Sequence, residues 1–366
     1  MTVRDIIDIT APPGTPSLLV LRALGLGDLL TAVPALRALR RAHPAHELVL
    51  AAPPRLAEAA CATGTVDRLL PVSAPGGAAP ARLDWTGPPP DLAVDLHAPG
   101  PGGARDGHRH PSAVDGEGPG GRAALRALRP RRLLGYARPG FPGPDWQHDE
   151  HERVRWCRLL EWYDIPADPA DLCIPRPGRP SPAPGAVVLH PGAETAAHRW
   201  PADRYAAVAR ELLRAGHRVA VTAGAGEGEV AHAVAERAGL PAPAVFGGDA
   251  DVPFADLAAL VARARAVVTG DTGPAHLASA LGTPSVVLFG PTTPRLWGPP
   301  ESPLHRALRH PGGGPTARPG AVHGARPDER LLRITVEEVV AALATLPAPL
   351  GHLPDRDRSP ARGVAA

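Results

Sequence analysis

The sequence predicts an α/β protein with two domains, each built around a largely parallel sheet. Two arrays of alternating strand and helix patterns support this class, because such alternation is typical of parallel sheets covered by helices. Between the arrays lie residues 175–185, whose five prolines can neither pair in a sheet nor continue a helix. The expected domains are therefore 1–174 and 186–346, joined by the linker 175–185 and followed by a disordered tail at 347–366. A length of 366 residues also suits two domains of about 150 residues each.

The first array starts with a buried strand at 17–22, an apolar run between Pro16 and a glycine-containing loop. From Asp28 onward apolar residues recur at helical spacing with arginines on the other side, which predicts an amphipathic helix. Further strands are expected at 47–51, 66–70 and 92–96, a helix at 151–163, and loops in the proline- and glycine-rich stretches 73–90 and 98–122.

The second array repeats the pattern after the linker. Strands are expected at 186–190, 218–222, 266–269 and 285–289, and helices at 203–215, 227–238, 254–264, 274–281 and 336–346, the last after a proline- and glycine-rich stretch at 298–328. In parallel sheets ligands bind at the carboxyl ends of the strands, which between two such domains is the cleft. Functional residues are therefore expected in the loops that follow strands.

Composition and charge exclude several classes of function. Arginine supplies all 39 basic residues, which are scattered, and the formal net charge of +2 does not indicate a protein that binds nucleic acid. No apolar run approaches the ~18 residues of a membrane span, and the first residues lack the pattern of a secretory signal. The separated Cys61, Cys157 and Cys173 favour buried thiols over disulfides or a zinc site. We therefore expect a cytoplasmic protein without a transmembrane segment; contact with the inner face of the membrane stays open.

The first candidate site follows the strand at 17–22. Residues 25–28 form a glycine turn that ends in Asp28, at or beside the first turn of the next helix. The spacing does not fit a dinucleotide-binding fingerprint, because the third glycine would fall at Leu30. Asp28 has two compatible interpretations: a helix cap, and a general base that the positive helix end keeps ionised beside the cleft.

The second candidate site is Asp271-Thr272-Gly273, which follows the strand at 266–269 and opens a helix. Backbone N–H groups at that helix end, together with the Thr272 hydroxyl, can bind a pyrophosphate, although an ordinary capped turn has the same pattern. His276 lies on the same opening turn, where it is either a ligand contact or a histidine of the core.

Two further loops carry polar side chains. After the strand at 186–190 come Thr195, His198 and Arg199, which can bind phosphate oxygens or simply be solvated. After the strand at 218–222 comes Glu227, whose carboxylate can hold ribose hydroxyls or stabilise a helix N-terminus. The other histidines show no metal-binding spacing, and the motifs of serine hydrolases, P-loop proteins and kinases do not occur.

Taken together, these segments closely resemble glycosyltransferase family 9, the bacterial ADP-heptose transferases of lipopolysaccharide core synthesis. The resemblance is carried, in the family's order and across about residues 17–300, by LGDLLTAVPAL at 26–36, DLAVDLH at 91–97, LGY at 134–136, LHPG at 189–192, RWP at 199–201, DTG at 271–273, HLA at 276–278 and LFGPT at 288–292. It implies a GT-B fold, in which two Rossmann-like domains with parallel sheets face each other across a cleft. It also implies that the last helix, 336–346, packs back on the first domain.

The resemblance assigns roles to the candidate residues. Asp28 matches the family's catalytic base, and residues 271–273 match its pyrophosphate loop, with His276 beside them. Thr195 matches a phosphate-binding hydroxyl, and Glu227 matches the carboxylate that binds ribose. The acceptor would bind in the first domain and the nucleotide-sugar in the second.

Three points of this correspondence stay open. Glu229 is an alternative to Glu227 as the ribose ligand. The family usually carries a lysine two residues before the Trp-Pro pair, whereas this chain has His198 there, followed by Arg199. The segment 98–122 is more glycine-rich than in the family, so no acceptor contacts can be carried over.

The resemblance predicts an inverting glycosyltransferase that needs no metal and no other cofactor. The enzyme would transfer a heptose-like sugar from ADP-heptose or another ADP-sugar to a glycan, a lipid-linked acceptor or a secondary metabolite, with no nucleic acid as a partner. Two alternatives remain. A nucleotide-sugar epimerase of similar shape would need a second acid/base pair in the cleft. A sugar-nucleotide-binding protein without turnover is favoured if the missing lysine is decisive.

Overall fold

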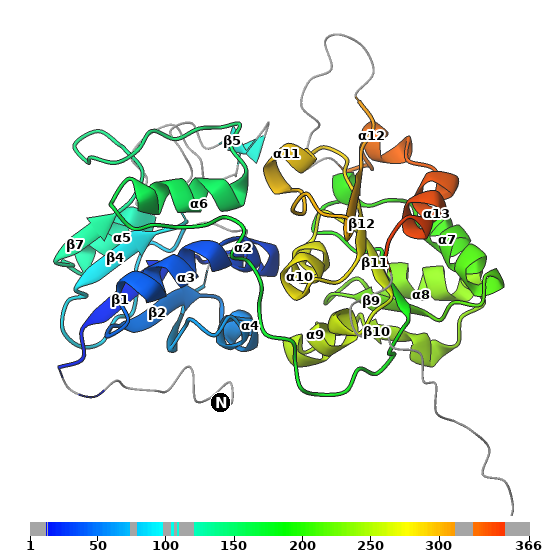
Figure 1. Ribbon diagram of the computed structural model, residues 1–366, viewed down its shortest axis with the longest axis horizontal. Coiled ribbons are helices and arrows are strands. Elements are labelled where there is room, and N and C mark those ends of the chain that lie inside the picture. The colour runs from blue at the N-terminus through cyan, green and yellow to red at the C-terminus, as the bar shows by residue number, and fades with distance from the viewer. Residues whose placement is uncertain are drawn as a thin grey trace, which may run out of the picture.

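The computed structural model describes residues 12, 14–73, 79–97, 104–105, 108–109, 121–311 and 325–347. The chain forms two lobes, each with a parallel sheet between helices (Figure 1). The lobes meet at α2 (Leu26–Thr31) of the first and α10 (Gly273–Leu281) of the second. The α/β class predicted from the alternating patterns is confirmed.

The first sheet has the strand order β3-β2-β1-β4-β7 within the described residues, and all of these neighbours run parallel. Its strands are β1 (Ser17–Leu21), β2 (Glu47–Ala52), β3 (Arg68–Pro71), β4 (Leu92–Asp95) and β7 (Arg132–Leu134). Every residue of β1 is buried, because helices cover both faces of the sheet, and this explains the uninterrupted apolar run in the sequence. Most of the expected loop 98–122 lies outside the described residues, but a short antiparallel pair, β5 (Ala104–Arg105) and β6 (His108–Arg109), occurs within it.

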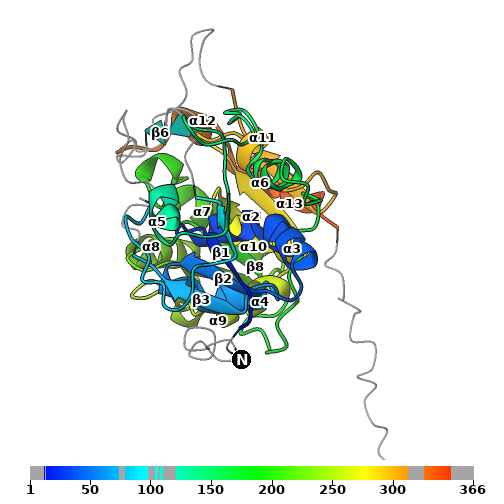
Figure 2. The same ribbon diagram turned by 90° about the vertical axis from the view of Figure 1, so that its left-hand side faces the viewer.

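Helices pack on both faces of the first sheet (Figures 1 and 2). α3 (Val33–Ala42) and α6 (Glu152–Glu161) cover one face, and α5 (Gly121–Ala127) covers the other. The 3-10 helix η1 (Pro54–Leu56) leads into α4 (Ala57–Ala62). The single helix expected from Asp28 is divided into α2 and α3 at Ala32, because Pro34 has no N–H to donate to the preceding turn.

The second sheet has the order β10-β9-β8-β11-β12-β13 within the described residues, again with parallel neighbours. Its strands are β8 (Val187–His190), β9 (Val219–Ala223), β10 (Val245–Gly247), β11 (Ala266–Gly270), β12 (Ser285–Leu288) and β13 (His305–Leu308). The four strands predicted from apolar runs are confirmed. The pattern does not reveal β10 and β13, because both are short strands at the sheet edges and only partly buried.

The helices of the second lobe are α7 (Ala202–Arg214), α8 (Gly228–Ala238), α9 (Phe254–Ala262), α10, α11 (Pro294–Trp297), α12 (Glu329–Leu332) and α13 (Val336–Ala344), with 3-10 helices η3 (Ala196–His198) and η4 (Ala242–Ala244). Over the described ranges, no helix is both long enough and apolar enough to cross a membrane. The stretch expected to be irregular at 298–328 contains β13, and part of it, 312–324, lies outside the described residues.

The expectation that the last helix packs back on the first domain is wrong. α13 packs on α7 and β12 of the second lobe, where Val339 and Leu343 join the core. The indole Nε1 of Trp200 donates a hydrogen bond of 3.1 Å to the carbonyl of Ile334, just before α13, and so ties this helix to its own lobe. Of the tail expected at 347–366, only Pro347 lies within the described residues.

The proline-rich segment 175–185 contains neither helix nor strand and runs along the second lobe. Just before it, the N–H of Ile174 donates to the carbonyl of Ala280 at 2.9 Å. At its end, the N–H of Gly185 donates to the carbonyl of Arg263 at 2.8 Å. These bonds attach the segment to the second lobe at both ends.

The two lobes share an apolar core where they touch. Leu30 and Val33 of the first lobe are buried in the same cluster as Leu277 and Leu281 of α10. We refer to these four residues as the interdomain seam. The packing of these four residues places the N-termini of α2 and α10 next to each other.

Candidate active site

Three loops that carry predicted site residues lie along one edge of the second sheet. They follow β9, β8 and β11, which are neighbours in that order, and the carboxyl ends of parallel strands lie at one edge. The loop after β11 opens α10, whose N-terminus faces α2 (Figure 1). Asp28 of the first lobe is therefore close to the predicted pyrophosphate loop of the second.

Two glycines allow α2 and α10 to approach. A Cβ atom on Gly27 would lie only 2.7 Å from Cδ2 of His276, and one on Gly273 would lie 3.2 Å from Cβ of Leu26. Gly27, the residue before Asp28, is thus in close contact with the His276 ring. The structure brings together Asp28, His276 and the Asp271-Thr272-Gly273 loop, which the sequence separates by more than 240 positions.

The Asp28 carboxylate has a local structural role as well as a position at the interface. Oδ2 accepts a hydrogen bond of 3.2 Å from the N–H of Gly25, the N-cap residue of α2, and so satisfies a backbone donor at the start of the helix. Oδ1 lies 3.3 Å from Nη2 of Arg22, and 16% of the Asp28 side chain is exposed. Both interpretations of Asp28, as a cap and as a group at the cleft, therefore fit the geometry.

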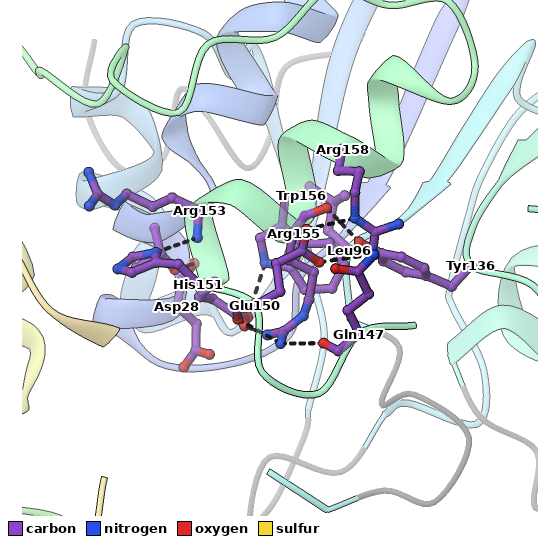
Figure 3. Close-up of polar contacts among 12 residues, drawn as sticks. Asp28, Leu96, Tyr136, Gln147, Glu150, His151, Arg153, Arg155, Trp156 and Arg158 are labelled. Carbon is purple, nitrogen blue, oxygen red and sulfur yellow. Dashed lines mark hydrogen bonds and ion pairs between the residues drawn. The ribbon is translucent and has the colours of Figure 1, made fainter. Parts of the chain in front are cut away.

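A buried charge network that the sequence did not suggest lies behind Asp28 (Figure 3). The guanidinium of Arg22, whose side chain is 1% exposed, also contacts Oε1 of Glu152 at 2.9 Å. It stacks over the ring of Trp156 at 4.7 Å, and Trp156 Nε1 donates to the same Glu152 oxygen at 3.0 Å. An arginine at the end of an apolar strand was the available sequence signal, because a buried charge needs a partner.

The pyrophosphate loop is held by contacts within the second lobe. The Asp271 carboxylate accepts a hydrogen bond of 3.0 Å from the Thr292 hydroxyl, and its other oxygen lies 3.3 Å from Nε2 of His276. The Thr272 hydroxyl pairs with that of Thr269 at 2.7 Å and makes no cap bond to α10. The positive end of α10 is therefore directed at the interface without a side-chain cap, as an anion site requires.

A histidine of the first lobe forms a hydrogen bond with the second lobe. His151, the N-cap of α6, accepts a hydrogen bond at Nδ1 from the N–H of Arg153 (3.1 Å) and donates from Nε2 to the carbonyl of Gly298 (3.0 Å). Burial, together with the nearby charge of Arg153, lowers the pKa of His151 to about 4. The two hydrogen bonds thus belong to the neutral imidazole.

The loop after β8 lies beside the pyrophosphate loop. The Thr195 hydroxyl is 2.9 Å from Nδ1 of His198, and the carbonyl oxygen of His198 faces Gly270, where a Cβ would lie 3.2 Å away. Arg199 is exposed, and its Nε donates to the carbonyl of Ala193 at 3.0 Å. His198 is thus half-buried against the neighbouring loop, while the Arg199 guanidinium is held on its own loop.

Glu227 lies between two loops at the carboxyl ends of β8 and β9. Its Oε2 accepts a hydrogen bond of 2.8 Å from the N–H of Gly224, and a Cβ on Gly192 would overlap it at 1.9 Å. His190 is 3.8 Å away, and burial lowers the pKa of that imidazole although the carboxylate opposes the change. Glu229, the alternative ribose ligand, is exposed on the first turn of α8.

Comparisons with known proteins bear on the family and the fold of this chain. Residues 175–314 match the model of glycosyltransferase family 9 (heptosyltransferase). Lipopolysaccharide heptosyltransferase 2 of Escherichia coli (strain K12) is 33% identical over 159 residues, 43% of this chain and 45% of that protein. Lipopolysaccharide heptosyltransferase 1 of Pseudomonas aeruginosa is 34% identical over 168 residues, 44% of this chain and 45% of that protein. The matches thus span less than half of the length of these curated relatives.

Solved structures share the two-lobed fold over nearly the whole chain. A glycosyl transferase family 9 protein from Veillonella parvula has a TM-score of 0.68 and 21% identity, with 92% of this chain and 99% of that one covered. The E. coli heptosyltransferase WaaC with ADP has a TM-score of 0.62 and 19% identity, with 90% and 99% covered. At these identities the likeness establishes the GT-B fold. Residues 175–314, most of the second lobe, are thus similar to glycosyltransferase family 9 (heptosyltransferase), and the whole chain shares the fold of solved members of that family.

Proposed function

We propose that this protein is an inverting glycosyltransferase that transfers a heptose-like sugar from an ADP-sugar to a hydroxyl group of a glycan, a lipid-linked acceptor or a metabolite. The observation that carries the proposal is the contact between α2 and α10, with Gly27 against His276. This contact brings the turn that carries Asp28 in one lobe next to the N-terminus of α10 in the other, which has no side-chain cap. A base and an anion site on opposite sides of an interface suit a transfer between an acceptor and a phosphate-activated sugar.

In the proposed reaction Asp28 removes the proton of the acceptor hydroxyl. The acceptor oxygen attacks the anomeric carbon as the bond from that carbon to the phosphate oxygen breaks, and ADP leaves with the electron pair. A single displacement of this kind inverts the anomeric configuration. A carboxylate within hydrogen-bond reach of the hydroxyl contributes about 10²–10⁴-fold to such a step.

The leaving ADP would be stabilised by groups of the second lobe. The N-terminus of α10, with Thr272 and Gly273, would receive the pyrophosphate, and His276 lies on the same turn. Thr195 and either His198 or Arg199 would contact phosphate oxygens from the neighbouring loop. These groups supply positive charge and hydrogen-bond donors, so the proposed mechanism needs no metal ion.

Glu227 would hold the ribose hydroxyls. Its carboxylate is fixed by the N–H of Gly224 at the carboxyl ends of β8 and β9, one strand away from the pyrophosphate loop. The choice of ADP as the nucleotide follows from the relatives, which are named heptosyltransferases, and from a structural neighbour that holds ADP.

The test is a thermal-shift panel of ADP, UDP, GDP, CDP and ADP-heptose. A ligand at 100 times its Kd should stabilise the protein by about 2.7 kcal/mol, and ADP forms should do so at the lowest concentrations. Glu227→Gln should weaken ADP binding at least tenfold, whereas Glu229→Gln, which changes an exposed carboxylate two residues away, should not. Equal affinity for all four nucleoside diphosphates would refute the donor assignment.

A further inference from the structure

The buried network behind Asp28 contains a second carboxylate that the proposed reaction does not use. Glu152 lies on the first turn of α6, with 4% of its side chain exposed. It is separated from Asp28 by 124 positions in the sequence, and Arg22 bridges the two carboxylates by contacting both. Burying a charged pair costs several kcal/mol per ion before its attraction is counted, so a network of this kind is not required for stability alone.

Arg22 is shared unequally between the two carboxylates. Its Nη2 lies 2.9 Å from Oε1 of Glu152 and 3.3 Å from Oδ1 of Asp28. Its other nitrogens are occupied, because Nη1 donates to the carbonyl of Leu96 at 2.6 Å and Nε to the backbone carbonyl of Asp28 at 3.1 Å. Arg22 therefore holds the backbone of Asp28 in place, while its charge is directed mainly at Glu152.

Glu152 is itself fixed from two sides. Trp156 Nε1 donates to Oε1 at 3.0 Å, and Arg155 donates through Nη1 to Oε2. Arg155 is anchored in turn by the carbonyls of Gln147 and Glu150, as Figure 3 shows. The position of Glu152 is thus set by the folded start of α6 rather than by Asp28.

Other ionisable groups reach this point from the remaining elements. On the α10 side, His276 lies against Gly27 and is paired with Asp271. On α6, burial lowers the pKa of His151 to about 4, so this imidazole is neutral at physiological pH. The guanidinium of Arg22 is in direct contact with the Asp28 carboxylate.

From this geometry we propose that Glu152 is a positioning residue for the reaction: through Arg22 it fixes the Asp28 carboxylate and keeps the arginine charge from fully pairing with it. This inference rests on the proposed role of Asp28 as the base. Without the Glu152 charge, Nη2 of Arg22 would turn to Asp28 alone, and a carboxylate in a complete ion pair accepts a proton less readily. The expected consequence is slower turnover with unchanged donor binding.

The test is a ¹³C NMR titration of protein labelled at the aspartate carboxyl carbons, with the Asp28 signal assigned from its absence in Asp28→Asn. Glu152→Gln should shift the midpoint of this titration to lower pH by about one unit, the lower end of the effect of an adjacent charge. The matched control is Glu150→Gln, because Glu150 is also a buried carboxylate and is paired with a different arginine, Arg158. Glu150→Gln should leave the midpoint unchanged.

Kinetics give the second measurement. Glu152→Gln should lower kcat for ADP release from ADP-heptose about tenfold at neutral pH and leave the donor Kd unchanged. Glu152→Asp keeps the charge and should retain the wild-type midpoint, so it serves as the readout if the glutamine variant does not fold. An unchanged midpoint in folded Glu152→Gln would overturn the inference. Full turnover in Asp28→Asn would instead refute the proposed function, which the titration does not depend on.

Discussion

The contact between Gly27 and His276 makes one substitution especially informative. In Gly27→Ala the added Cβ would lie 2.7 Å from Cδ2 of His276, whereas carbon atoms in contact normally lie about 3.5–4.0 Å apart. Either the His276 ring, which is paired with Asp271, or the N-termini of α2 and α10 would therefore have to move by about 1 Å. A misplacement of 1 Å between a base and a reacting group costs about 10²-fold in rate, or about 2.7 kcal/mol of transition-state stabilisation.

The higher helix propensity of alanine opposes the destabilisation that this close contact causes in Gly27→Ala. Gly27 lies within α2, where alanine is better than glycine by about 1 kcal/mol, while a forced contact in a packed region costs about 1–3 kcal/mol. The melting temperature should therefore change little, although kcat falls about 10²-fold. Donor Kd should stay within a few-fold of wild type, because the proposed donor contacts come from the second lobe.

The assay is steady-state release of ADP from ADP-heptose with an acceptor that supports turnover, together with calorimetric donor binding. The matched control is Gly25→Ala, where the nearest atom to the new Cβ, Oδ2 of Asp28, lies at an ordinary 3.5 Å. This control loses a favourable cap residue but leaves the distance between the helices unchanged. If Gly27→Ala turned over as fast as wild type, the close approach of α2 and α10 would not be required for the reaction.

Three further predictions follow from the site. If His198 carries the phosphate contact, donor Kd should rise between pH 6 and 8.5, through the range where histidine loses its proton; a flat profile with a large loss only in Arg199→Ala would assign the contact to Arg199. ADP should draw the lobes together, and an unchanged radius of gyration by small-angle scattering at saturation would contradict this. The lowered pKa of His151 means that the unfolded chain binds the proton first, so stability should fall as pH drops from about 6.5 to about 4; in melting curves, His151→Gln should make this fall smaller without abolishing it, because burial also lowers the pKa of His190 and His305.

Much of the architecture could be predicted because the signals are local. The apolar runs of β1 and β11 and the glycine turns after them are visible within about twenty residues each, and they locate Asp28 and Asp271 at strand ends. Short edge strands such as β13 lack a continuous buried run, so periodicity does not reveal them. The packing of α13 depends on Trp200, more than 130 positions earlier, and no local pattern encodes that partner.

The candidate site was predictable only as separate pieces. The loops with Thr195, Glu227 and Asp271 share one sheet edge because of the strand order, which alternation alone does not determine. The pairing of Arg22 with Glu152 joins residues 130 positions apart, and each alone resembles an ordinary charged residue. Packing in three dimensions, rather than the type of residue, gives them a role.

The interdomain seam has a thermodynamic consequence for the whole chain. Leu30, Val33, Leu277 and Leu281 are buried between lobes, so unfolding either lobe would expose apolar surface of the other. Fully burying a leucine or valine side chain stabilises a protein by about 1.5–3 kcal/mol. The lobe that stays folded would lose part of this stabilisation. Neither lobe can then melt without weakening its neighbour. Scanning calorimetry should accordingly record one cooperative transition rather than two, and the first lobe should be poorly stable when it is produced without residues 175–347.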